Sequence, residues 1–230
     1  MATAMIIEKT ATNPIRHRRR NVASPSEPFN GRYNVATQFA QTYVKELQGL
    51  LDLLPAQEID RVCDVLYQAY QKNRTVYLFG NGGSAALASH MACDLGKGTF
   101  APNHVPLPGV KRFKVLSLTD NVPMVTAWAN DTAYDNVFAE QLANFIEAGD
   151  VAFGISGSGN SINILRALTL AKQCQAITIA LAGFHGGKVR SLVDYPVIVR
   201  CNNMQQVEDI HLVIAHIVFL NLQQRICSQV

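Results

Sequence analysis

The sequence lacks long apolar runs, paired-cysteine motifs and a strong excess of charge of either sign. No stretch approaches the roughly 18 consecutive apolar residues of a membrane span, so we expect no association with a membrane. The net charge of +3 argues neither for nor against nucleic acid, and we expect no such partner. Five cysteines show no C-x-x-C spacing and cannot all pair within one chain, which favours reduced thiols and a cytoplasmic protein.

The first 32 residues differ in composition from the rest of the chain. They contain clustered arginine, then proline, serine and glycine, without apolar periodicity, and no apolar segment follows the basic cluster as it would in a secretory signal. The arginines offer a contact for an anionic partner, but a mobile tail without a part in the chemistry is the simpler interpretation. We therefore expect a disordered basic tail over residues 1–32 and a single domain over 33–230.

From Tyr33 onwards, apolar residues recur at helical spacing and then give way to short β-branched runs. Two leading helices, over 34–53 and 56–72, precede five strands, expected at 75–79, 113–118, 150–155, 176–181 and 195–199. Further helices are expected at 83–95, 121–129, 134–147, 160–173, 186–192 and 204–227, and a loop is expected at 96–112. Alternating helices and apolar strands predict an α/β fold, in which helices cover both faces of a parallel sheet.

Two of the expected strands run directly into turns of small residues that open a helix. VYLF (76–79) continues into GNGGSA, and VAFGI (151–155) continues into SGSGNS. At the C-terminal end of a parallel strand, free backbone N–H groups and the helix dipole favour an anion, and glycine lets the chain approach it closely. The sequence therefore predicts an anion site at these two turns.

Three classes of anionic ligand compete for the turns. Gly80, Gly82 and Ala85 match the G-x-G-x-x-A of a dinucleotide site, but the next strand ends at Asp120, too far on to supply the usual acidic partner. Neither turn has the Gly-Lys-Ser/Thr of a nucleoside triphosphate loop. One serine in the second turn would serve as a helix cap. Three within six residues favour a phosphate monoester instead, and a sugar phosphate fits best.

The segments GNGGSAALASHMACDL and GISGSGNSINILRAL, in that order, resemble the sugar isomerase (SIS) domain and, within it, the phosphoheptose isomerases. The resemblance extends from about residue 34 to the end of the sequence. It implies a three-layer αβα sandwich around a five-stranded parallel sheet of the flavodoxin-like type, preceded by N-terminal helices. It also implies a homotetramer with sites at subunit interfaces, and a zinc-assisted isomerase that interconverts sedoheptulose 7-phosphate and glycero-manno-heptose 7-phosphate for lipopolysaccharide heptose.

The same resemblance assigns the site residues by position. The substrate contacts fall on Asn81, Gly82, Gly83, Asn130, Asp131, Ser156, Gly157, Ser158 and Ser161, to which we add Ser84, Asp94 and Glu208. The metal positions, with one zinc ion per subunit, fall on His90, Asp94, Glu208 and His216. Two of these depart from the family pattern, because Asp94 stands where the isomerases carry an acid/base glutamate and Glu208 stands where they carry a glutamine.

The helical spacing of these residues bears on the metal site. His90 and Asp94 are four residues apart, so their side chains share one helix face and form a reasonable half-site for zinc, although a surface ion pair has the same spacing. Glu208 and His216 are separated by about 12 Å of rise and about 80° of rotation, and barely converge on one ion. Either ligands arrive from different subunits or the last helix begins later. Glu208 with His211 is the better local pair; a histidine packed in a helix interface is an equal interpretation of His211.

Aldose–ketose isomerisation needs a base, an acid and an electrophile, because a proton moves between neighbouring carbons through an enediol. We expect Asp94 and His216 to exchange the protons while His90 and Glu208 complete the zinc site. An aspartate reaches about 1 Å less far than a glutamate, and misplacement on that scale can cost about a hundredfold in rate. Glu208 either compensates for the shorter reach of Asp94, by donating more charge to the metal, or indicates another substrate. The alternative is a non-catalytic SIS protein that binds a sugar phosphate or a replication-initiator partner.

The leading helix over 34–53 carries more apolar surface than a two-layer contact needs, including Phe39, Tyr43 and the LLDLL end. Exposed apolar stripes of this kind usually mark subunit contacts. We therefore expect these helices to form a four-helix core between subunits.

Overall fold

The computed structural model describes residues 32–100 and 109–228, with backbone only for residues 32–34. The expected basic tail lies outside the described residues except for Arg32, which begins the first helix, and so does the 101–108 part of the expected loop. The chain divides into two units, residues 1–42 and residues 43–230. The sheet, the cavities and all predicted site residues belong to the second unit.

The element order is close to the one that the sequence predicts. The helices are α1 (Arg32–Leu51), α2 (Ala56–Gln71), α3 (Gly83–Gly98), α4 (Val122–Asp131), α5 (Ala139–Ala143), α6 (Ile162–Gln173), α7 (Val189–Leu192) and α8 (Met204–Cys227), with a 3₁₀ turn at Tyr134–Asn136. The strands are β1 (Val76–Gly80), β2 (Val115–Ser117), β3 (Val151–Ser156), β4 (Ile177–Gly183) and β5 (Tyr195–Val199). All five expected strands are present, so the α/β expectation is confirmed.

Three helical expectations were wrong in extent. The helix expected to end at residue 95 continues to Gly98, which shortens the expected loop. The single helix expected over 134–147 is a 3₁₀ turn followed by the short helix α5, because this break lets the adjacent Val137 and Phe138 both enter the core. The helix expected over 186–192 forms only at Val189–Leu192.

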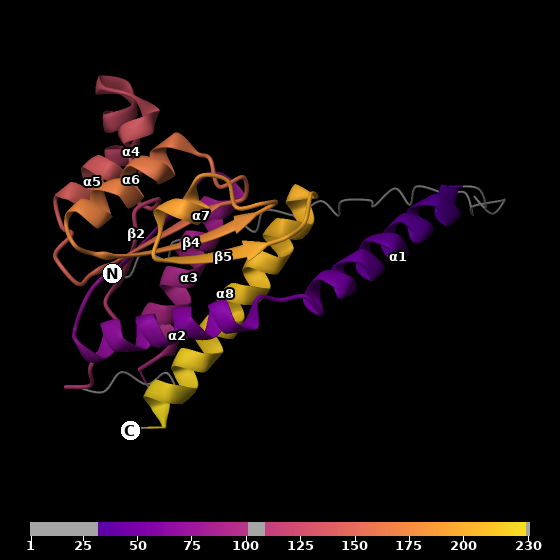
Figure 1. Ribbon diagram of the computed structural model, residues 1–230, viewed down its shortest axis with the longest axis horizontal. Coiled ribbons are helices and arrows are strands. Elements are labelled where there is room, and N and C mark those ends of the chain that lie inside the picture. The colour runs from indigo at the N-terminus through magenta and orange to yellow at the C-terminus, as the bar shows by residue number, and fades with distance from the viewer. Residues whose placement is uncertain (1–31, 101–108, 229–230) are drawn as a thin grey trace, which may run out of the picture. The chain divides into compact units, whose positions relative to one another are not determined.

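The sheet is entirely parallel, with the strand order β2-β1-β3-β4-β5. Its side chains alternate between two hydrophobic clusters, as the two-residue period of a strand requires. Leu78, Phe153 and Leu181 join the cluster that contains α2, α3 and α8. Phe79 and Ala180 join the cluster that contains α5, α6 and α7. The two helical layers on either side of the sheet are visible in Figure 1 and confirm the expected three-layer sandwich.

Both edges of this sheet are short or interrupted. β2 has only three residues, and β5 carries Pro196, paired in register with Ala180.

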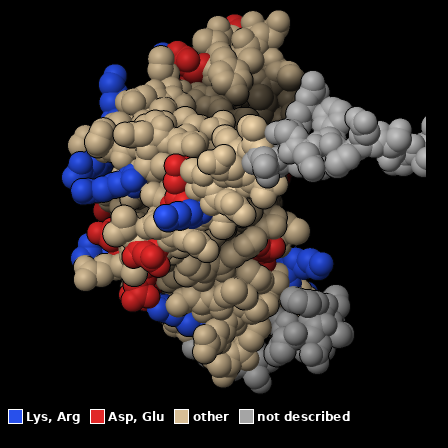
Figure 2. All heavy atoms as spheres, turned by 90° about the vertical axis from the view of Figure 1, so that its right-hand side faces the viewer, with Lys and Arg blue, Asp and Glu red and all other residues tan. Residues whose placement is uncertain are grey.

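Charged side chains of both signs are interspersed on the face shown in Figure 2, so no single-sign field dominates there.

α8 is long and apolar enough, by length and composition alone, to pass for a membrane span, which the sequence reading did not anticipate. Its best window has a mean hydropathy of 1.3, and 39% of that window is buried inside the protein. Val207, Ile210, Ile214 and Val218 pack into the cluster shared with α2, α3 and the sheet. A core helix passes the same test, so the finding is weak evidence for a membrane segment.

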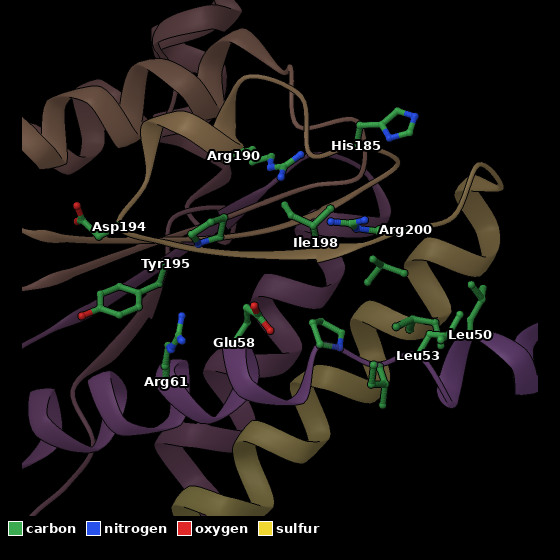
Figure 3. A pocket seen from close by; sticks show the side chains of 15 residues that line it. Leu50, Leu53, Glu58, Arg61, His185, Arg190, Asp194, Tyr195, Ile198 and Arg200 are labelled. Atoms are coloured by element: carbon green, nitrogen blue, oxygen red, sulfur yellow. The ribbon is translucent and has the colours of Figure 1, made fainter.

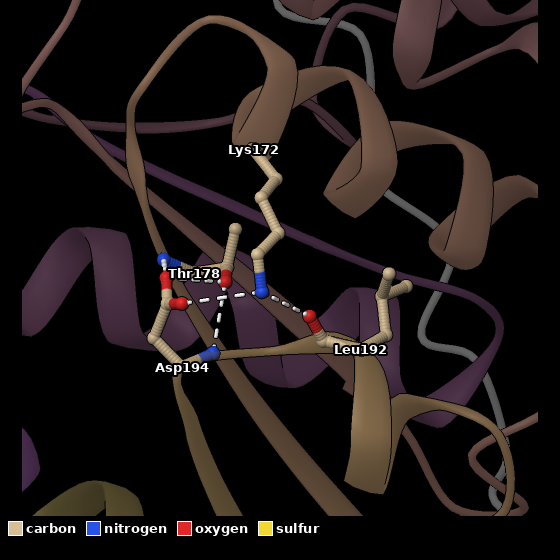
Figure 4. A network of polar contacts seen from close by, with 4 residues as sticks. All are labelled: Lys172, Thr178, Leu192 and Asp194. Carbon is tan, nitrogen blue, oxygen red and sulfur yellow. Dashed lines mark hydrogen bonds and ion pairs between the residues drawn. The ribbon is translucent and has the colours of Figure 1, made fainter.

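A polar network joins α6 to the edge of the sheet, as Figure 4 shows. The Thr178 backbone N–H and hydroxyl donate to Asp194 Oδ2 at 2.9 and 2.8 Å, and Lys172 Nζ lies 3.3 Å from Asp194 Oδ1. Burial by itself would raise the pKa of the Asp194 carboxyl. The hydrogen bonds from Thr178 and the charge of Lys172 outweigh that effect and lower the pKa.

This lowered pKa predicts a specific dependence of stability on pH. Because the folded pKa of Asp194 lies below the unfolded value of about 4, its contribution is fully present above that pH and is lost as the pH falls through the folded pKa. We expect Asp194→Asn to lower the free energy of unfolding by about 1 kcal/mol at pH 7, a value reduced by the partial exposure of the carboxylate. Urea unfolding at a series of pH values measures this difference. Asp135→Asn, which breaks an exposed ion pair with Arg166, is the control; a loss for Asp194→Asn that persists unchanged as the pH falls through the folded pKa of Asp194 would contradict the assignment.

Candidate active site

The two glycine- and serine-rich turns are neighbours in the fold. β1 pairs with β3 in parallel, with Gly80 opposite Ile155, so the turns that follow these strands lie side by side at the carboxyl edge of the sheet. This is the edge where open parallel sheets bind ligands.

A pair of asparagines joins the two turns. Asn81 Nδ2 donates to Asn163 Oδ1 at 2.9 Å, and Asn163 Nδ2 donates back to Asn81 Oδ1 at 2.8 Å. Tyr134 Oη also donates to Asn81 Oδ1, at 3.0 Å. The sequence analysis missed Asn163 and Tyr134. A polar asparagine between Ile162 and Ile164 is the sequence signal that could have indicated the first of them, and in the structure this asparagine is 3% exposed.

No serine of the second turn caps a helix with its side chain. Ser161 occupies the N-cap position of α6, but its side chain makes no capping hydrogen bond; its Oγ accepts from Ser156 Oγ at 3.2 Å. α3 begins after Gly82 and also lacks a side-chain cap, as does α2 after Pro55. By contrast, Asn121 caps α4 and Asn203 caps α8. The helices that open at the two turns therefore have no side-chain cap, which leaves their first backbone N–H groups available to an anion.

The first turns of α8 pack directly against the strand ends. A Cβ at residue 183 would lie 2.5 Å from Val207 Cγ1, and one at residue 157 would clash with the sulfur of Met204. Close approach of α8 therefore requires glycine at 183, beside the branched Val207 side chain and the Gly157 carbonyl, whereas the flexible Met204 side chain can move aside for a Cβ at 157. The N-terminal end of α8 thus lies over the second turn.

α8 and α3 together form a cluster of two histidines and an aspartate. His90 Nε2 lies 2.9 Å from His216 Nε2 and 3.2 Å from Asp94 Oδ2, and His216 Nε2 lies 4.0 Å from the same oxygen. The ligand atoms of the three residues all lie within 4.8 Å of one another. Their side chains are 44%, 25% and 47% exposed for His90, Asp94 and His216, so the cluster is open to a ligand.

This cluster fits a zinc ion in its donor set. Two imidazole nitrogens and one carboxylate oxygen are the ligands of many catalytic zinc sites, which leave a further position open for substrate. Glu208, the fourth metal candidate, is not in this group: its Oε2 lies beside the first turn of α3, 3.1 Å from where a Cβ at residue 83 would be. The structure therefore brings three of the four metal candidates together and places the fourth at the first turn.

A cavity of about 380 Å³ lies between α3 and α8. Its lining includes Gly83, Ser84, His90, Glu208 and His211, so it connects the first turn with one histidine of the cluster. A larger hollow of about 600 Å³ lies elsewhere, between α2 and the edge strand β5, where Glu58 and Arg61 face Tyr195 and Ile198 (Figure 3). It contains no predicted site residue, and we place the chemistry at the smaller cavity.

Two further groups lie near the carboxyl edge of the sheet. Asn130 and Asp131 end α4 and hydrogen-bond to each other at 2.9 Å; within 32–100 and 109–228 neither bonds to the two turns. The sequence analysis also missed a hydroxyl network after β2. There Ser89 donates to Asp120, and Ser117 lies 2.6 Å from Thr119.

Comparison with other proteins now identifies the family. The SIS domain family matches residues 42–183. The chain belongs to the SIS domain family. It is 36% identical to a phosphoheptose isomerase of Aquifex aeolicus over 176 residues, which cover 76% of this chain and 88% of that protein. A phosphoheptose isomerase of Sulfurimonas denitrificans is 37% identical over 70% of this chain and 78% of its own length. The solved structure of the phosphoheptose isomerase of Neisseria gonorrhoeae covers 84% of this chain and 98% of its own, with a TM-score of 0.71 and 27% identity. Within the SIS domain family, these relatives confirm the resemblance to the phosphoheptose isomerases.

The uncapped N-terminus of α6 predicts separate effects on stability and on anion binding. We expect Ser161→Ala to lower the free energy of unfolding by only about 0.5 kcal/mol, because it loses one hydrogen bond from Ser156 and no cap, while the affinity for a sugar phosphate falls severalfold. Asn203→Ala is the control, since it removes a true cap and is expected to cost about 1 kcal/mol. Urea unfolding and calorimetric titration measure the two effects. A stability loss for Ser161→Ala equal to that of the control would assign the serine to capping.

Proposed function

We propose that this SIS-family isomerase converts sedoheptulose 7-phosphate to glycero-manno-heptose 7-phosphate in the cytoplasm, with a zinc ion bound by its own histidines. Its curated relatives make it a sugar-phosphate isomerase; the sugar, the metal and the roles of individual residues belong to the proposal. One observation supports it above all. The anion turns are joined by Asn81 and Asn163, and the helix that opens at the first turn also carries His90 and Asp94.

The turns hold the phosphate in this proposal. Ser156, Ser158 and Ser161 supply hydroxyl donors, and the uncapped N-termini of α3 and α6 supply backbone N–H groups. The asparagine pair holds the two turns at a fixed spacing. Gly82, Gly83 and Ser84 of the first turn lie at the other side of the phosphate, and Asn130 and Asp131 bind sugar hydroxyls.

The proton transfers fall to the histidine–aspartate cluster. His90, Asp94 and His216 would hold the zinc ion, which when bound polarises the sugar carbonyl. The carboxylate of Asp94 takes the proton from one carbon of the sugar and returns it to the neighbouring carbon. His216, which would hold zinc through one ring nitrogen, exchanges the proton between the two oxygens of the enediol through the other ring nitrogen. Glu208, at the mouth of the same cavity, contacts the sugar and contributes to the metal site.

The extent of the cavity restricts the ligand. Seven residues of α3, about 10 Å of helix, separate Gly83 from His90. A ligand that reaches from the first turn to the cluster is therefore extended, which favours a long sugar phosphate over a small one.

Turnover measurements test the proposal directly. Conversion of sedoheptulose 7-phosphate by the wild type should rise on addition of zinc, and Asp94→Asn or His216→Ala should lower kcat at least a hundredfold. Asp60→Asn and His185→Ala change exposed residues outside the cluster and should retain activity. Undiminished turnover in either site variant removes that residue from the mechanism. A wild type that binds the sugar phosphate without converting it would instead support the non-catalytic alternative, to which the departures at Asp94 and Glu208 could lead.

Assembly into a homotetramer through α1 is the second part of the proposal. Val35, Phe39 and Val44 on this helix are 69%, 71% and 52% exposed in the single chain. Burial of such side chains against another copy would be favourable by about 25 cal/mol per Å².

The proposed assembly predicts a loss of association when α1 is made polar. Sedimentation at micromolar concentration should show tetramers for the wild type and smaller species for Phe39→Lys, because a charge replaces the largest exposed apolar side chain of α1. Val122→Lys, which changes an apolar residue 62% exposed on α4, is the control and should remain tetrameric. A monomeric wild type would contradict the proposal.

A further inference from the structure

His211 is the most conspicuous buried polar side chain that the proposed mechanism does not use. It is 0% exposed, and within the described chain neither of its ring nitrogens has a hydrogen-bond partner. Burial lowers the pKa of the imidazole to about 4; the nearby Ala182 backbone opposes this slightly, although it forms no hydrogen bond of normal geometry. The ring is therefore neutral at pH 7, with one donor and one acceptor.

A buried imidazole without partners carries an unrecovered desolvation penalty. An apolar side chain of similar shape would avoid that penalty, so stability alone does not account for a histidine at this position. Unsatisfied buried groups of this kind occur where function requires them.

One group near His211, the carboxylate of Glu208, is able to accept a hydrogen bond from its ring. Glu208 precedes His211 by three residues on α8, so the two side chains lie on the same helix face, and both line the 380 Å³ cavity. The other ionisable groups of that cavity are already engaged, His90 with His216 and Asp94, and Asp209 with the Tyr43 hydroxyl at 2.5 Å. Glu208 has no hydrogen bond or ion pair to any residue in 32–100 or 109–228.

We propose that His211 is a positioning residue for Glu208, donating a ring N–H to its carboxylate when that carboxylate turns from the first turn of α3 towards a ligand in the cavity. The inference rests on the proposed function, in which Glu208 contacts the sugar phosphate and the metal. A buried hydrogen bond to a ligand carboxylate fixes its orientation, and loss of such a bond typically costs about 10- to 100-fold in metal affinity or activity.

A double-mutant cycle tests this assignment. His211→Phe retains a ring without nitrogens, Glu208→Ala removes the carboxylate, and the double variant closes the cycle. The readouts are the melting temperature of the metal-free chain and the dissociation constants for Zn²⁺ alone and for sedoheptulose 7-phosphate. His211→Phe should keep or raise the melting temperature and weaken at least one ligand about tenfold or more. In the Glu208→Ala background the same change should alter affinity less than about twofold.

Two further variants keep the test decisive. His211→Gln restores a buried donor and should bind the ligands more tightly than His211→Phe. If His211→Phe does not fold, the dissociation constants of His211→Gln are compared with those of the wild type instead. Asn221→Leu is the matched control, because Asn221 Oδ1 is also buried without a partner on α8 but does not line the cavity; its affinities should equal those of the wild type.

The outcomes separate this inference from the proposed function. Wild-type affinity in His211→Phe, or an equal loss with and without Glu208, overturns the positioning role while the proposed function stands. A wild type that binds neither zinc nor the sugar phosphate overturns the proposed function, and the positioning role with it.

Discussion

The packing of α8 against the carboxyl edge of the sheet is the constraint on which the site depends. Val207 reaches the strand ends only because residue 183 has no side chain, and the lack of a side chain at residue 157 leaves room for Met204. That contact fixes the rotation of α8, and with it the positions of Glu208 and His216 relative to α3. Gly157 of the second turn thus serves the packing of the helix as well as the approach of a ligand, and Gly183 at the end of β4 serves the packing.

The sequence was sufficient to predict the layers of the fold because the determining signals are local. β-branched runs define all five strands, and the helical period defines the principal helices. The errors occurred where tertiary packing overrides local preference, as in the 3₁₀ turn before α5, which lets Val137 and Phe138 reach the core together. That α8 is apolar enough to resemble a membrane span was not anticipated, because polar residues interrupt its apolar ones along the sequence.

The candidate site was predictable only in part, since it depends on contacts between distant segments. The spacing of His90 and Asp94 on one helix indicated half of the cluster. The family resemblance assigned His216 to the same site, but no local pattern shows that this residue, 126 positions further along, approaches His90 to 2.9 Å. The partner of Asn81 was missed for the same reason, because Asn163 reaches it only through the pairing of β1 with β3.

The two edges of the sheet restrict how copies of this chain can associate. β2 is too short to template another strand, and Pro196 in β5 has no N–H to offer one. Extension of the sheet from one copy into the next is therefore disfavoured at both edges. Contacts between subunits are therefore expected to be made by side chains on helices and loops and not by continuation of the sheet.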